Sequence, residues 1–97
     1  MQTTIPPHLT STYKLISCAF PARMELEEYF ALLAILYDEL SDRNLAEVMT
    51  YCSGKDYGVV LNDIYSLISS NLPKPDAIAG VKQRLMRCGY EAWLKEE

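Results

Sequence analysis

The chain has 97 residues, of which 49% are hydrophobic and 23% are charged, and its formal net charge is -4 at pH 7. This length and composition indicate a single globular domain and exclude a disordered chain. The acidic balance argues against a general nucleic-acid binder and against attraction to anionic membranes, because both need a basic surface.

Residues 1–9 have neither the positive charge nor the long apolar run of a signal peptide. The apolar stretch at residues 29–37 is too short to span a bilayer, so we expect a cytoplasmic protein without membrane association. Because Pro6 and Pro7 exclude a regular helix, residues 1–9 are predicted to be an irregular tail before one helical domain, residues 10–97.

The first predicted helix runs from a cap at Thr10 or Ser11 to about Ala19, with Tyr13 on its apolar side. Pro21 ends it, because the residue before a proline avoids the helical conformation.

The second predicted helix spans about residues 25–39 and begins with three glutamates, which favour the positive end of a helix dipole. Leu32 and Ile35 lie off its main stripe, so apolar residues cover most of its circumference. A helix of this kind is buried on several sides, and we expect it to be the central element of the fold. The main stripe is Leu26, Tyr29, Phe30, Leu33, Leu36, Tyr37 and Leu40.

Ser41 is predicted to cap a third helix over about residues 42–52, and Gly54 follows where a left-handed residue is needed. A fourth helix is predicted over about residues 57–70, with Asp56 as its cap. Their apolar stripes are Leu45, Val48, Met49 and Cys52, and then Val60, Leu61, Ile64, Leu67 and Ile68.

The fifth predicted helix starts at Pro75 and ends at Gly89, and residues 91–97 form a short tail that carries Trp93. If the helix ends in a Schellman motif, Tyr90 folds back onto Leu85. No segment has the alternation or the hairpin turns of β-strands. The sequence therefore predicts a compact all-α bundle of about five short helices, with the fourth and fifth packed beside the second.

The chain has three cysteines, an odd number: Cys18, Cys52 and Cys88. They are widely spaced, and each lies on an apolar stripe. We therefore expect buried, reduced thiols. There is no CxxC pair, and the only histidine, His8, lies in the predicted tail, so we expect neither a metal site nor a histidine base. There is no glycine-rich phosphate loop, and no cofactor is expected.

Paired carboxylates can act as general acid and base, and Asp38, Glu39 and Asp63 are the candidates. They lie on polar helix faces or near helix ends. We interpret them as solvated surface acids and predict that the protein is not an enzyme.

Lys82, Arg84 and Arg87 form the densest basic group of the chain. A helical wheel places Arg84 beside Arg87 and Lys82 on the opposite flank of the apolar stripe. We interpret them as solvated flanking charges that can pair with acidic side chains elsewhere in the chain, with contact to nucleic acid or to an acidic partner as the alternative.

Seven tyrosines are the most distinctive feature of the composition. Tyr51, Tyr57, Tyr65 and Trp93 lie beside the apolar stripes, where they can pack at the rim of the core with the polar atom in water. The same property enriches such residues at interfaces, so they are also candidates for a partner-binding or dimer surface.

A set of helix-packing and capping residues carries a family resemblance: residues 29–36 (YFALLAIL), Leu40-Ser41-Asp42, Gly58-Val59, and residues 72–76 (LPKPD) followed by Ile78, Val81, Arg84, Leu85, Gly89 and Tyr90. Through them the chain after about residue 20 resembles a small helical family of unknown function from actinobacteria, including mycobacteria. This sequence is richer in tyrosine and poorer in arginine and alanine, and Lys74 stands where a better cap is common. The resemblance implies a compact helical fold in a bacterial protein and no catalytic residues.

These observations favour a non-enzymatic protein-interaction or regulatory module with an unidentified protein partner, in which Tyr51, Tyr57, Tyr65, Trp93, Arg84 and Arg87 are the candidate contact residues. A homodimer is possible. The alternatives are a nucleic-acid-associated protein that uses the basic fifth helix, and an immunity-type inhibitor of a protein partner.

Overall fold

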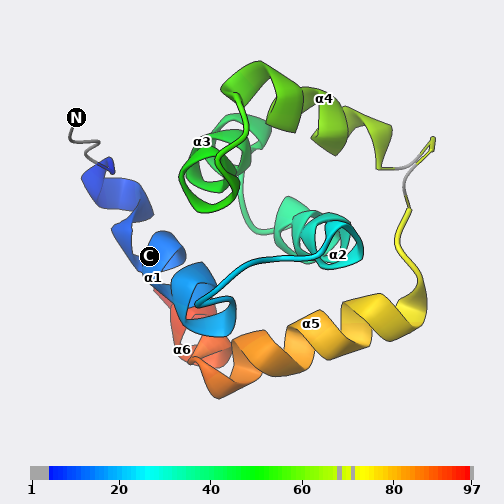
Figure 1. The fold of residues 1–97 in the computed structure, drawn as a ribbon. Helices are drawn as coiled ribbons and strands as arrows, with labels where there is room; N and C mark the ends of the chain where they lie inside the picture. Colours follow the sequence, from blue (N-terminus) through cyan, green and yellow to red (C-terminus); the bar gives the residue numbers. More distant parts are fainter. Residues whose placement is uncertain (1–4, 68, 71, 97) are drawn as a thin grey trace.

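The computed structural model describes residues 5–67, 69–70 and 72–96, and these form an all-α globule in which no strand occurs (Figure 1). The prediction of an all-α bundle is confirmed, with one helix more than the five expected. A 3₁₀-helix, η1 (Pro7–Leu9), precedes six α-helices: α1 (Thr10–Ala19), α2 (Leu26–Tyr37), α3 (Asp42–Ser53), α4 (Tyr57–Ser66), α5 (Pro75–Arg87) and α6 (Tyr90–Leu94).

Helix α2 is the central element, as its all-round apolar pattern predicts. It packs against α3, α4 and α5, which surround it in Figure 1. Leu32 and Leu33 are both fully buried although they point in different directions from the helix axis. Leu26 and Tyr37, which the stripe placed in the core, are exposed. They are the first and last residues of α2, where fewer neighbouring turns can cover a side chain.

Local capping chemistry sets several helix ends, and the ends at Ser41 and Gly54 are as expected. The Glu25 backbone N–H donates to Glu28 Oε1 at 2.9 Å in a capping box at the start of α2. At the start of α3, the Ser41 hydroxyl accepts from the Asn44 N–H at 3.1 Å. Gly54 ends α3 with φ 79°, a left-handed conformation that favours glycine.

One predicted cap and one predicted end are wrong, and the predicted cap of α4 is confirmed in its position. Leu9, not Thr10 or Ser11, occupies the cap position of α1, and the Thr10 hydroxyl instead turns back to the Pro6 carbonyl oxygen. Asp56 is at the cap position of α4, but its side chain accepts no capping hydrogen bond. Helix α4 also ends at Ser66, four residues earlier than predicted. Ile68, assigned to its stripe, lies outside the described residues.

The prediction of an irregular tail over residues 1–9 is wrong for the C-terminal end of that segment. Pro7–Leu9 form η1, and the Leu9 side chain is 1% exposed, within the core. Ile5 packs against the same core. The helical domain therefore begins before Thr10, because a proline is well tolerated in the first turn of a short helix. Residues 1–4 lie outside the described part of the chain.

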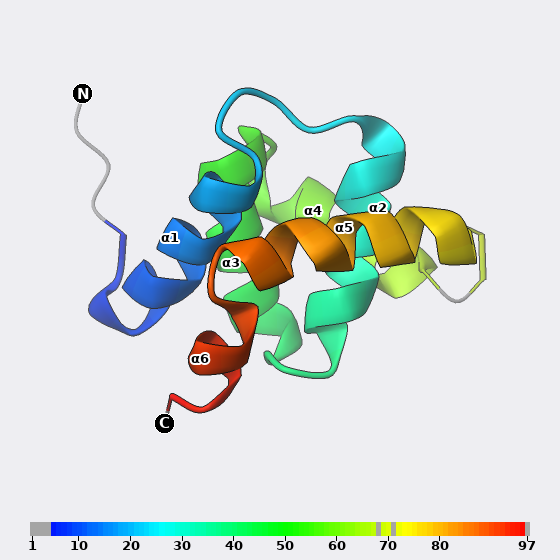
Figure 2. The ribbon, with the colours of Figure 1, turned by 90° about the horizontal axis from the view of Figure 1, so that it is seen from below.

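Cys18 and Cys88 form a disulfide with their Cα atoms 5.9 Å apart, so the prediction of reduced thiols is wrong for these two residues. Their sequence separation of 70 hides the pairing from a local reading of the chain. The bridge joins the last turn of α1 to the residue that follows α5, and Figure 2 shows these two helices side by side. Cys52 is a free thiol.

The prediction of a C-terminal tail over residues 91–97 is wrong for residues 91–94, which belong to α6. Gly89 separates it from α5 with φ 96°, as its predicted role as a helix stop requires. Tyr90 and Leu85 are both buried. The Trp93 Nε1–H donates to the Thr12 hydroxyl at 3.0 Å, which ties α6 to α1. The two ends of the described chain thus lie on one side of the molecule (Figure 1).

Candidate partner-binding surface

A hollow of about 770 Å³ lies where α1, α3 and α4 meet, and three tyrosines from these three helices line it. Tyr13 comes from α1, Tyr51 from α3 and Tyr57 from α4. We call this hollow the tyrosine groove; its other lining residues are Ile5, Arg43, Glu47 and Thr50.

The local sequence explains how the groove forms. Arg43, Glu47 and Tyr51 follow one another at spacings of four, so they lie in one row along α3. The turn at Gly54 then reverses the chain, and α4 packs back against α3 with Tyr57 as its first residue. Helix α1 also packs on α3 and supplies Tyr13.

The composition of the groove suits contact with another protein. Tyrosine presents a large apolar ring and a polar hydroxyl at low cost in side-chain entropy. Tyr57 is 41% exposed, so part of its ring faces solvent. Arg43 and Glu47 add one charge of each sign beside the rings, which can orient a partner.

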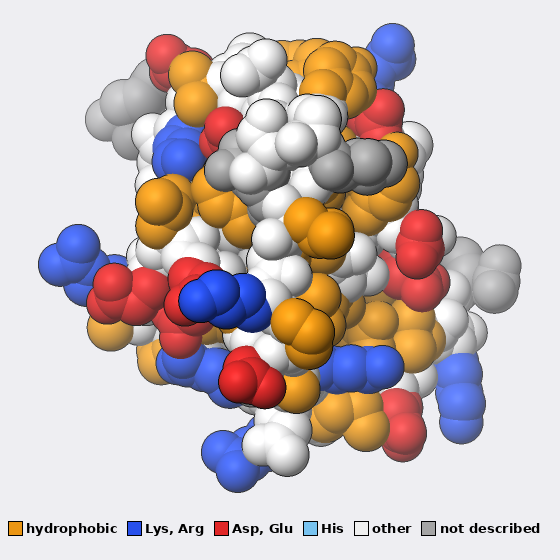
Figure 3. Space-filling model, turned by 90° about the vertical axis from the view of Figure 1, so that its right-hand side faces the viewer, with side chains coloured by type: hydrophobic (Ala, Val, Ile, Leu, Met, Phe, Trp, Pro, Cys, Tyr) orange, Lys and Arg blue, Asp and Glu red, His pale blue; other side chains and the backbone are white. Residues whose placement is uncertain are grey.

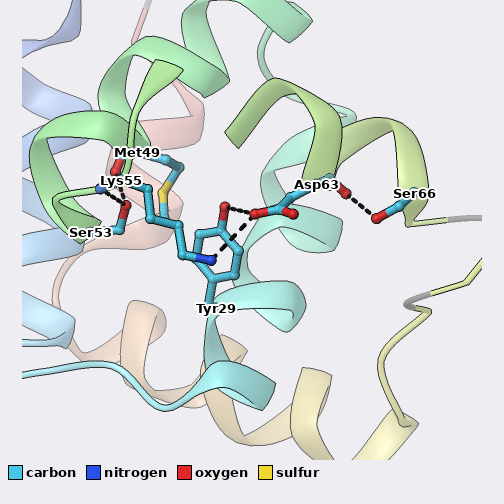
Figure 4. Close-up of polar contacts among 6 residues, drawn as sticks. All are labelled: Tyr29, Met49, Ser53, Lys55, Asp63 and Ser66. Atoms are coloured by element: carbon cyan, nitrogen blue, oxygen red, sulfur yellow. Dashed lines mark hydrogen bonds and ion pairs between the residues drawn. The ribbon is translucent and has the colours of Figure 1, made fainter. Parts of the chain in front are cut away.

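A second polar arrangement lies where α2 meets α4 (Figure 4). The Tyr29 hydroxyl donates to Asp63 Oδ2 at 2.7 Å, and Lys55 Nζ is 3.3 Å from the same oxygen. The Lys55 ammonium also lies 4.1 Å from the centroid of the Tyr29 ring. Asp63 is half-buried and paired, so its interpretation as a solvated surface acid is wrong.

This cluster acts as a tie between helices. Burial raises the pKa of Tyr29 far above its usual value, and the hydrogen bond and negative charge of Asp63 raise it further. Tyr29 therefore keeps its proton and stays a donor. Three chain segments, α2, the α3–α4 connection and α4, meet at one carboxylate.

We expect Tyr29→Phe to lower the free energy of unfolding by about 1–3 kcal/mol, because it removes a hydrogen bond to a charged acceptor. Urea unfolding at pH 7 measures the change. Tyr65→Phe is the matched control: Tyr65 is 61% exposed, and its substitution is expected to change stability by less than about 0.5 kcal/mol. Equal effects of the two substitutions would contradict the role of the Tyr29–Asp63 hydrogen bond.

Cys52 is not an activated nucleophile. Burial raises the pKa of its thiol to about 12, so almost none of it is thiolate at neutral pH. Within residues 5–67, 69–70 and 72–96, no three or more His, Cys, Asp or Glu side chains form a group that could hold a metal ion. In the same part of the chain, every buried side-chain polar atom has a hydrogen-bond partner.

The structure brings together two of the six contact residues named from the sequence, Tyr51 and Tyr57. Tyr65 is on α4 but does not line the groove. Trp93 is half-buried on α6, where its ring stacks on Tyr90 with centroids 5.8 Å apart and its nitrogen bonds to Thr12. Trp93 is therefore part of the packing between α6 and α1.

The two arginines of α5 have different surroundings. Arg84 Nη1 is 2.8 Å from Glu28 Oε2, and its guanidinium lies 4.3 Å from the centroid of the Phe20 ring. Arg84 thus links α5 to α2, and its charge is compensated within the fold. Arg87 is exposed at the end of α5.

Sequence reasoning missed Tyr13, Arg43 and Glu47 as groove residues. The row at Arg43, Glu47 and Tyr51 is a local signal that could have identified two of them. Tyr13 gave no such signal, because its contribution depends on how α1 packs against α3.

The face that contains the α4–α5 connection has a different character. On it, hydrophobic side chains appear in groups separated by acidic and basic ones (Figure 3).

Among the described residues, no helix is both long enough and apolar enough to cross a membrane. Comparisons with family models, with curated proteins and with solved structures found no match for this chain.

Proposed function

We propose that this protein is a non-enzymatic protein-interaction or regulatory module, and that the tyrosine groove binds its protein partner. The observation that carries the proposal is the convergence of Tyr13, Tyr51 and Tyr57 around one hollow. Tyrosine and arginine are enriched among the residues that contribute most of the binding free energy at protein interfaces.

The groove supports this function better than the basic residues of α5 support nucleic-acid binding. Arg84 already pairs with Glu28, and the chain carries a net charge of -4. The phosphate backbone of a nucleic acid would have to displace Glu28 from Arg84. It would also be repelled by the negative net charge of the protein. An immunity-type inhibitor and a homodimer are both special cases of a protein-binding groove, and the experiment below distinguishes them by the species that is captured.

The resemblance to the actinobacterial helical family stays a prediction, as does a cytoplasmic location. The disulfide bears on the location, because disulfides persist mainly in oxidising compartments. The redox state of Cys18 and Cys88 in the host cell tests this part of the proposal.

Site-specific photo-crosslinking tests the groove directly. We expect a photoreactive phenylalanine analogue at position 57 to crosslink a protein partner in the native host lysate, at least about fivefold more than the same analogue at position 65. Position 65 is the matched control because Tyr65 is on the same helix and more exposed, yet lies outside the groove. Non-specific crosslinking would be greater at position 65, because Tyr65 is the more exposed of the two. Stronger crosslinking at position 57 therefore indicates contact at the groove.

The crosslinked product also identifies the class of partner. A product of twice the chain mass indicates a homodimer, and a product with one other protein indicates a heteromeric partner. The double charge reversal of Arg43→Glu and Glu47→Arg should reduce the specific product. Equal crosslinking at positions 57 and 65 would contradict the proposal.

A further inference from the structure

The Cys18–Cys88 disulfide lies at the surface of the fold. Cys18 is exposed on the last turn of α1, and Cys88 is half-buried directly after α5. A hollow of about 310 Å³ runs along the seam between α1 and α6, and Cys88 lines it. Cys18 does not line this hollow, but Cys18 is itself exposed, so an external thiol can approach the bridge there without opening of the core. Exposed disulfides are the labile ones in proteins.

Charge near the bridge favours attack by an anionic thiolate. Lys14 precedes Cys18 by four residues in α1, which places the two on the same face of the helix, and Lys14 lines the hollow beside Cys88. Arg87 is exposed next to Cys88. Glu96 also lines the hollow and partly offsets these charges. A nearby cation attracts the attacking thiolate and stabilises the thiolate that leaves.

We propose that the Cys18–Cys88 bridge is a redox site that an external dithiol reduces in the folded protein, by direct attack on the exposed Cys18, with Lys14 as a positioning residue for the incoming thiolate. The inference goes beyond the proposed function and does not depend on the tyrosine groove.

The reaction is a pair of thiol–disulfide exchanges. A thiolate of the dithiol bonds to Cys18 Sγ, the Cys18–Cys88 bond breaks, and Cys88 leaves as a thiolate that takes up a proton. The second thiol of the reductant loses its proton, attacks the mixed disulfide and releases Cys18, which is protonated in turn. The protein gains two electrons and two protons, and the dithiol becomes a disulfide.

The third cysteine does not divert this exchange. Cys52 is half-buried on α3, and its raised pKa leaves it mostly protonated at neutral pH. The reduced protein therefore reoxidises to the same Cys18–Cys88 pair. Because the bridge spans a sequence separation of 70, its reduction widens the unfolded ensemble and lowers the fraction of protein that is folded.

Reduction of the native protein by dithiothreitol, quenched by alkylation and read by mass spectrometry, tests the proposal. Direct attack predicts a rate that rises linearly with dithiothreitol concentration and stays within twofold in the core variant Leu33→Ala. If reduction required unfolding, this variant would accelerate it by about thirtyfold or more. Ile64→Val, at a buried α4 position, replaces Leu33→Ala if the latter does not fold. Direct attack then predicts an unchanged rate, whereas reduction through unfolding would be accelerated about two- to tenfold.

The role of Lys14 has its own control. Lys14→Gln is expected to slow reduction roughly two- to threefold at low salt, and the difference should vanish in about 1 M salt, where charges are screened. Lys82→Gln removes an exposed lysine from α5, away from the hollow, and should leave the rate unchanged. An equal effect of both substitutions overturns the role of Lys14. A folded protein that resists reduction, or a rate that follows global stability, overturns the redox site.

Discussion

Replacement of Cys18 and Cys88 by alanine is expected to lower the free energy of unfolding by about 4 kcal/mol. The bridge spans 70 residues of chain separation, and cross-linking a loop of this length restricts the unfolded ensemble by about that free energy. A domain of this size has a total stability of roughly 5–15 kcal/mol, so the variant should be folded but marginal. Urea unfolding of the oxidised wild type and of the double variant measures the difference.

Two controls separate the bridge from side-chain packing. Cys52→Ala removes the free, partly buried thiol and should have a smaller effect than loss of the bridge. Reduced and alkylated wild-type protein should resemble the double alanine variant in stability. A loss below about 1 kcal/mol in the double variant would show that the disulfide contributes little to this fold.

Leu33→Ala is expected to cost about 2–5 kcal/mol, the usual range for a leucine in a well-packed core. Leu33 is fully buried on α2, the helix that α3, α4 and α5 surround, so its removal leaves a cavity that few neighbours can fill. Chemical denaturation at pH 7 gives the change in the free energy of unfolding.

The same helix offers a matched control. Leu26→Ala makes the same chemical change at a position that is 65% exposed, and is expected to change stability by less than about 0.5 kcal/mol. If Leu33→Ala also cost less than about 0.5 kcal/mol, α2 could not be the central element of the core.

Helix identity and several helix ends could be predicted because they depend on neighbours in sequence. The Ser41 hydroxyl reaches an N–H three residues away, and Gly54 and Gly89 adopt conformations that disfavour other residues. Ends that depend on packing were predicted less well. Helix α4 stops at Ser66 although its apolar spacing continues, and Pro7–Leu9 join the fold because Leu9 finds a place in the core.

The candidate site was predictable only in part. Tyr51 and Tyr57 stood out because large aromatic residues beside an apolar stripe must either pack at a rim or contact a partner. Tyr65 shares that signal and faces solvent, and Trp93 shares it and packs between α6 and α1. Sequence spacing along one helix gives the direction of a side chain but not the element that lies opposite it.

The sequence by itself determined the all-α class, the central place of α2 and the stops at Gly54 and Gly89, because periodicity and backbone preference act within a few residues. Only the tertiary structure decided that Cys18 meets Cys88, that Tyr29 donates to Asp63, and that Tyr13 closes the tyrosine groove. These contacts join residues on different helices. Their partners are selected by how whole helices pack against one another, which no local pattern specifies.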